Sequence, residues 1–167
     1  NGIEYSTSSA SITVKDAANS ADSDLKVGMV VEVRGSRDDA SGKGHATEVL
    51  YADILEGPIT SINAAAGSLV VLGQSVVTDA NTVFDGTTGF SGASPLQVND
   101  VVEVSGTVDT AAHAIHASRI EKKPASGETY DLKGTVSGLG AGTFTLTPEG
   151  SLSALTVTFT GTLPSSI

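Results

Sequence analysis

Three histidines are the residues of this sequence that could bind a transition metal. His113 and His116 lie three positions apart near an expected strand, where this spacing places them on opposite faces. His45 lies in a glycine-rich loop of another part of the chain. A zinc or copper site needs three or four convergent ligands. We therefore interpret the histidines as surface residues, and expect neither a metal nor a cofactor.

Carboxylates gather in two short segments. One contains Asp16, Asp22 and Asp24, and the other contains Asp38 and Asp39. A calcium loop needs acidic residues at alternating positions around a glycine turn, followed by a bidentate acid. Neither segment has this spacing, so we interpret both as solvated turns.

The sequence also lacks a pattern typical of nucleophilic catalysis. Serine and threonine are abundant, but no serine lies in a Gly-x-Ser-x-Gly elbow. A glycosidase pair cannot be selected among the many acidic residues. We therefore predict that the chain is not an enzyme. For a sugar or another small ligand, Tyr51 and Phe90 are the candidate stacking rings.

Composition limits the partners further. The chain has 167 residues, a net charge of -10, 39% hydrophobic residues and no cysteine. Phosphate binding relies on a surplus of Lys and Arg, so this acidic balance argues against nucleic acid. Without cysteine there is no disulfide framework, and no apolar run approaches the roughly 18 residues of a membrane span. Abundant Gly, Ser, Thr and Val with few aromatic residues favour short strands joined by turns.

An internal repeat organises these strands. Residues 25–35 read LKVGMVVEVRG and residues 96–106 read LQVNDVVEVSG, 71 positions later. The match runs without a gap from residues 2–35 to residues 73–106. After Gly35 we expect a loop of different length and an offset of 65, which aligns Leu50 with Ile115. Such periodicity is the signature of a repeat architecture.

A second match places the boundaries of the units. Residues 57–72 resemble residues 134–146, with a shortened turn. We therefore predict a first unit at 1–56 that lacks its opening strand, a complete unit at 57–122, a linker at 123–133, and the opening strands of a third unit at 134–167. The tight Glu56-Gly57-Pro58 junction predicts that the first two units pack together.

Local sequence signals predict the secondary structure of the complete unit. Residues 59–62 and 68–71 flank an Asn-Ala-Ala-Ala-Gly turn and are expected to form a hairpin. The alternation of residues 114–120 slips between Ala117 and Ile120, which predicts a bulge. Ser94-Pro95-Leu96 is expected to form one helical turn.

The repeated motif resembles a bacterial family, the OB-like repeated domain known as domain of unknown function 5666. The residues that carry the resemblance are Gly57, Gly67, Leu69, Leu25, Val27, Gly28, Val31, Glu32, Val33, Gly35 and Glu56. The resemblance implies an all-β fold of tandem small five-stranded OB-like barrels, here with incomplete units at both ends. It also implies an exported bacterial protein, extracellular or on the cell surface, whose precursor is often lipid-anchored. It brings no catalytic residues. Because the sequence begins at Asn1, we expect a processed or excised piece of a longer precursor.

The incomplete units suggest a function. A unit without one of its strands leaves unpaired edges, which a strand from another chain can pair. The last unit offers the element that the first one lacks, and a head-to-tail contact of this kind builds an open filament. We therefore predict self-association into an extracellular fibre or surface assembly, with residues 155–163 as a natural edge-pairing strand. The expected assembly residues are Leu155, Val157, Phe159, Val136, Phe144 and Leu146. The alternative is a monomeric cell-surface module that binds a carbohydrate or another small ligand.

Overall fold

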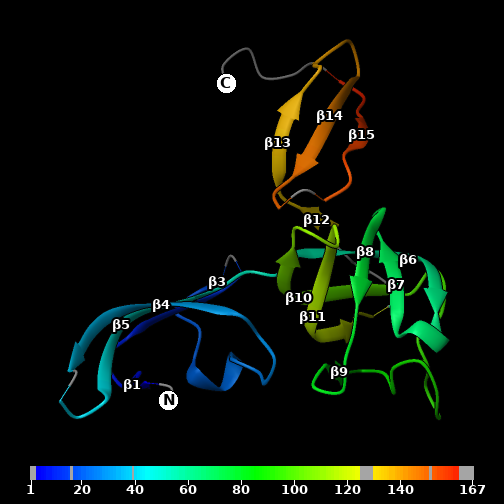
Figure 1. Cartoon of the computed structure of the whole chain (residues 1–167). Helices are drawn as coiled ribbons and strands as arrows, with labels where there is room; N and C mark the ends of the chain where they lie inside the picture. Colours follow the sequence, from blue (N-terminus) through cyan, green and yellow to red (C-terminus); the bar gives the residue numbers. More distant parts are fainter. Residues whose placement is uncertain (1–2, 16, 39, 125–129, 151, 162–167) are drawn as a thin grey trace.

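The structure is a computed structural model that describes residues 3–15, 17–38, 40–124, 130–150 and 152–161. It contains three β-sheets that follow one another along the chain, and the middle sheet contacts both others (Figure 1). Two short 3₁₀ helices are present, at Asp22–Asp24 and Ala64–Ala66.

The first sheet is built around its longest strand, β5 (Lys43–Tyr51). Along one edge of β5 lie the parallel strands β1 (Glu4–Ser6) and β2 (Ser11–Val14), one after the other. The short strand β3 (Ala17–Ala18) pairs with β2. The strand β4 (Val31–Asp38) runs antiparallel along the other edge of β5.

The middle sheet has seven strands. Their bounds are β6 (Leu55–Asn63), β7 (Ser68–Val71), β8 (Gln74–Val77), β9 (Val83–Asp85), β10 (Val101–Asp109), β11 (Ala114–Lys122) and β12 (Asp131–Leu132). β10 pairs with β11 and also with β6, so the strand path returns on itself in this sheet. The main hydrophobic core lies here, and Leu55, Ile59, Val104 and Ile115 are completely buried in it.

The third sheet is an antiparallel meander of β13 (Gly134–Ser137), β14 (Thr143–Pro148) and β15 (Leu155–Thr158). One of its pairs matches a pair of the middle sheet, although the β6–β7 register shifts between Ile59 and Ser61 and the β13–β14 register has no such shift. Val136 pairs with Leu146, as Ile59 pairs with Val71, so β13 and β14 correspond to β6 and β7.

The prediction of an all-β chain is confirmed, but the prediction of tandem closed OB-like barrels is wrong. The first and third sheets are open, and the cyclic strand path is confined to a seven-stranded middle sheet. The successive sheets stack like the coils of a β-solenoid. The same motif is exposed in β4 and buried in β10, so burial and closure depend on whether a strand covers each sheet edge. The motif carries no information on that.

The predicted change of offset after Gly35 is also wrong. Gly35 pairs with Ala46, and Gly106 pairs with Ala117, so the offset of 71 continues into β5 and β11. The alignment of Leu50 with Ile115 mistook one alternating apolar pattern for another. A period-2 pattern fits itself at several even shifts, and only strand pairing selects one.

The predicted bulge is confirmed, because the β10–β11 register shifts at Ser105/Gly106 and leaves Ser118 as the extra residue. The corresponding shift in the first sheet falls at Arg34/Gly35. A Cβ atom on Gly106 would lie 2.1 Å from the carbonyl oxygen of His116, and one on Gly35 would lie 2.1 Å from that of His45. The bulge thus explains the glycine that ends both copies of the motif.

The hairpin of β6 and β7 forms as predicted, with Gly67 at a φ of 62° after the turn. The helical turn predicted at Ser94–Leu96 does not form. Leu96 instead donates a backbone hydrogen bond of 2.7 Å to Gly89 and buries its side chain in the core. Burial of that leucine, not the local preference of Pro95, decides the backbone there.

Candidate assembly site

The strand β4 has no strand on its outer edge within the described part of the chain. All of its residues are exposed, and the side chains of Val31 and Val33 are 36% and 37% accessible. The corresponding residues of β10, Val102 and Val104, are completely buried. β6 covers β10 along this edge, and nothing described covers β4 in the same way. The same motif is therefore covered in one sheet and open in the other.

A groove runs beside this open edge. It has a volume of about 650 Å³, and its lining is mixed: Thr13, Lys15 and Glu32 are polar or charged, and the other lining residues are apolar or aromatic. Its lining includes Val30, Val31 and Leu50. In the middle sheet, the covering strand β6 contributes the buried residues Leu55 and Ile59 to the core. The groove thus lies beside an edge whose counterpart in the middle sheet is paired with β6.

The third sheet presents a second open edge. Within the described residues β13 pairs with β14 alone, and Val136 on this strand is 52% exposed. Leu139, in the turn after β13, is 54% exposed. The third sheet and the first sheet lie on different sides of the middle one (Figure 1).

The predicted assembly residues lie on the strands of this third sheet, except Phe159, which directly follows β15. Phe144 and Leu146 lie on β14, and Leu155 and Val157 lie opposite them on β15. The Phe159 ring lies 6.1 Å from the Phe144 ring, and its N–H donates a hydrogen bond to Gly142. Residues 155–158 are therefore paired within the chain, and the end of the predicted edge strand, 162–163, lies outside the described residues.

Charged side chains lock the first sheet to the middle one. The Lys15 ammonium, which follows β2, forms ion pairs with Glu56 of β6 and with Glu103 of β10, the latter at 3.2 Å. The Tyr51 hydroxyl donates a hydrogen bond of 2.7 Å to Glu103 Oε1, and Lys123 donates one of 2.9 Å to Oε2. These contacts pack the first sheet against the middle one. We call this set (Lys15, Tyr51, Glu56, Glu103 and Lys123) the junction cluster.

Burial and charge shift the pKa values in opposite directions here. Burial would raise the pKa of Glu103, but the hydrogen bonds from Lys123 and Tyr51 and the charge of Lys15 outweigh burial and lower it. Burial would lower the pKa of Lys15, but the hydrogen bond to Glu56 and the charges of Glu103 and Asp53 raise it. For Asp53 burial dominates and raises the pKa, and its Oδ2 atom is buried without a hydrogen-bond partner. The junction cluster therefore holds ionised Glu103 between two lysines.

Backbone groups of the repeated motif complete this interface. Val30 N donates a hydrogen bond of 2.8 Å to Ser105 Oγ, and Ser118 Oγ donates one of 2.6 Å to the carbonyl of Gly28. Ser118 is the extra residue of the bulge in β11. The first motif thus docks on the bulge of the second, and this contact joins the first sheet to the middle one.

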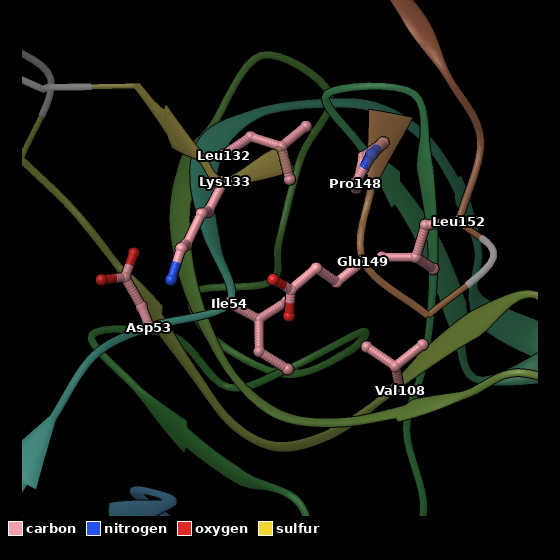
Figure 2. Close-up of a pocket in the computed structure, with 8 residues that line it drawn as sticks. All are labelled: Asp53, Ile54, Val108, Leu132, Lys133, Pro148, Glu149 and Leu152. Atoms are coloured by element: carbon pink, nitrogen blue, oxygen red, sulfur yellow. The ribbon is translucent and has the colours of Figure 1, made fainter. Parts of the chain in front are cut away.

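The third sheet is attached to the middle one by a buried amide. Gln74, 1% exposed, donates a hydrogen bond of 2.9 Å to the carbonyl of Ser153 and accepts one of 2.9 Å from its N–H. Leu152 is buried in the core of the middle sheet. Beside this attachment lies a cavity of about 190 Å³ between the two sheets. Figure 2 shows Asp53, Lys133 and Glu149 around this cavity, together with its apolar lining.

The other residues singled out from the sequence do not gather. Tyr51 is 2% exposed and its hydroxyl binds Glu103, so its ring offers no open stacking face. Phe90 is half-buried and packs edge-on against Phe84, with the ring centroids 5.9 Å apart. His116 lies 3.7 Å from Asp109, and no group of three or more metal-ligating side chains occurs in the described ranges.

The acidic segments form turns. Asp38 accepts hydrogen bonds from Ala40 N and from the Ser41 hydroxyl, and Asp24 accepts one from Ala21 N. The predicted members Asp16 and Asp39 lie outside the described residues. The junction cluster was not predicted from the sequence. Its members lie far apart, from Lys15 to Lys123, and no local spacing of residues indicates that they meet.

Taken together, the sheets and their junctions define a class of protein: an all-β repeat chain whose first two sheets meet at the bulged strand of a shared motif and whose third sheet is attached through Gln74 and Leu152. The family described as Domain of unknown function (DUF5666) matches residues 1–49 and 56–121, and the chain belongs to this family. No curated protein and no solved structure matches the chain. No helix in the described ranges has the length and apolar character that crossing a membrane demands.

Proposed function

We propose that this chain is a non-catalytic, exported bacterial structural protein, the subunit of an extracellular fibre or surface assembly whose copies join by β-strand complementation. The observation that carries the proposal is the contrast between β4 and β10. Val33 is 37% exposed, and Val104 at the same place in the motif is completely buried under β6. An open edge with a groove beside it is a template for strand addition.

The third sheet supplies the complementary element. The β13–β14 pair Val136–Leu146 matches the β6–β7 pair Ile59–Val71, and the first sheet has no pair of strands of this kind among its described residues. Donor and acceptor surfaces are different and lie on different sides of the middle sheet (Figure 1). Such a heterologous contact does not close on itself, so its repetition produces a filament.

The first test is negative-stain electron microscopy of the purified chain together with light scattering. We expect filaments with a regular axial repeat, and a Val136→Lys variant that remains monomeric because a charge replaces an apolar residue on the donor strand. The matched control is Val98→Lys, since Val98 is 50% exposed and Val136 is 52% exposed, but Val98 lies in the middle part of the chain, outside its strands. Monomers of the unmodified chain at all concentrations would contradict the proposal and favour the monomeric binding module.

A further inference from the structure

We propose that residues 132–135 of one copy pair with residues 30–33 of a second copy, and that Lys133 then lies directly opposite Glu32. This inference rests on the proposed function and adds the partner segment and its register. The partner is a second copy of this chain.

The register comes from the middle sheet, which contains the completed form of the same edge. There Val101 pairs with Pro58, Val102 with Gly57, Glu103 with Glu56, and Val104 with Leu55. Subtracting the motif offset of 71 gives residues 30–33 as the counterparts of these β10 residues in the first sheet. Because Val136 pairs with Leu146 as Ile59 pairs with Val71, Gly134 corresponds to Gly57. The counterparts of the four β6 residues are then residues 132–135. In this register Glu32 faces Lys133, and Val31 faces Gly134.

Charge supports this pairing. In the middle sheet the two facing residues, Glu56 and Glu103, are both acidic, and Lys15 from the neighbouring sheet must lie between them. The donor strand instead carries a lysine at this position. Opposite charges that face each other across antiparallel strands stabilise the pair, and like charges destabilise it. The position that is Glu56 in β6 is thus Lys133 in the donor segment. A lysine there can pair directly with Glu32.

Both members of the pair are accessible. The Glu32 side chain is 60% exposed, and its contact is with Arg34 on the same strand. Lys133 is exposed at the rim of the cavity in Figure 2 and connects β12 to β13. Leu132 already pairs with Leu55 of the middle sheet. In the completed sheet Leu55 pairs with β12 and with β10 at once, so a strand at this position can accept partners on both edges.

The test uses cysteine pairs, because the native chain contains no cysteine and gives no background. Separately purified E32C and K133C variants are mixed under mild oxidation, and the disulfide-linked heterodimer is followed by non-reducing electrophoresis. The control mixture is E32C with T135C, which moves the donor cysteine two residues along the same face. Directly opposed residues approach within disulfide range, whereas diagonal neighbours are about 7–8 Å apart. We expect the E32C–K133C heterodimer to form about tenfold faster or more.

Charge exchange provides the second measurement. E32K should weaken self-association about three- to tenfold, and adding K133E to the same chain should restore it. If the unmodified chain associates but the control pair links as fast, or the exchange does not restore association, this register is wrong while strand complementation stands. If the unmodified chain does not associate at all, the proposed function and this inference both fail.

Discussion

Tyr51, the last residue of β5, donates its hydroxyl hydrogen to Glu103 in the middle of β10, across the boundary between two sheets. Both residues are almost completely buried. The Lys15 and Lys123 ammonium groups contact the same carboxylate. This hydrogen bond and its neighbouring charges join the first sheet to the middle one.

Replacing Glu103 with Gln should weaken the junction. The amide oxygen can still accept the Tyr51 hydrogen bond, but Lys15 and Lys123 lose the charge that they share. We expect a loss of about 2–3 kcal/mol in the free energy of unfolding at pH 7, measured by urea denaturation. The exposed Glu32→Gln, at the same motif position, is the control and should change stability little.

The same variant tests the pH dependence. Because the folded protein lowers the pKa of Glu103 below its ordinary 4.5, its stabilising contribution is present above that value and is lost as the pH falls through the lowered pKa. The unmodified chain should therefore lose more stability than Glu103→Gln below about pH 4.5. Parallel pH profiles for the two chains would contradict this account.

Replacing Gly106 with Ala should disrupt the bulge. A Cβ atom there would lie 2.1 Å from a backbone oxygen, which cannot move without breaking the β10–β11 pairing. We expect a loss of about 2–4 kcal/mol in thermal or chemical unfolding. Gly140→Ala is the control, since its nearest neighbour atom is 3.7 Å away. Equal stabilities of the two variants would refute the steric role of Gly106.

Replacing Gln74 with Met should loosen the third sheet. The side chain keeps its approximate shape, but Ser153 loses both hydrogen bonds to the amide. We expect a cost of about 1–2 kcal/mol and faster hydrogen exchange at the Ser153 N–H. Gln97→Met, at an exposed position, is the control. Unchanged exchange at Ser153 would show that Leu152 alone holds this segment.

Replacing Phe159 with Pro should remove the end of the third sheet and, with it, assembly. Proline cannot donate the hydrogen bond of 2.9 Å that Phe159 gives to Gly142, and the contact with the Phe144 ring is lost. We expect a local destabilisation of about 1–3 kcal/mol and the loss of filaments by light scattering. Phe159→Leu keeps the N–H and should still assemble. Normal assembly of the proline variant would show that assembly does not depend on the end of β15, which lies at the opposite edge of the third sheet from β13.

The sequence by itself determined the all-β class, the repeated motif and the position of the bulge. These features depend on neighbours along the chain: alternation decides which side of a strand is apolar, and a slip in that alternation marks the extra residue near Ser118. The family resemblance likewise followed from the local motif, and the matching family model confirms it.

Tertiary structure alone decided which edges are covered. Val33 and Val104 occupy the same place in nearly identical motifs, yet one is exposed and the other completely buried. The difference lies in β6, a separate segment of the chain that pairs with β10. The junction cluster has the same origin, because Lys15 and Glu103 are 88 positions apart in the sequence and meet only where the two sheets pack. A residue's neighbours in sequence determine the strand in which it lies, whereas the partners across its edge are determined by pairing between distant segments.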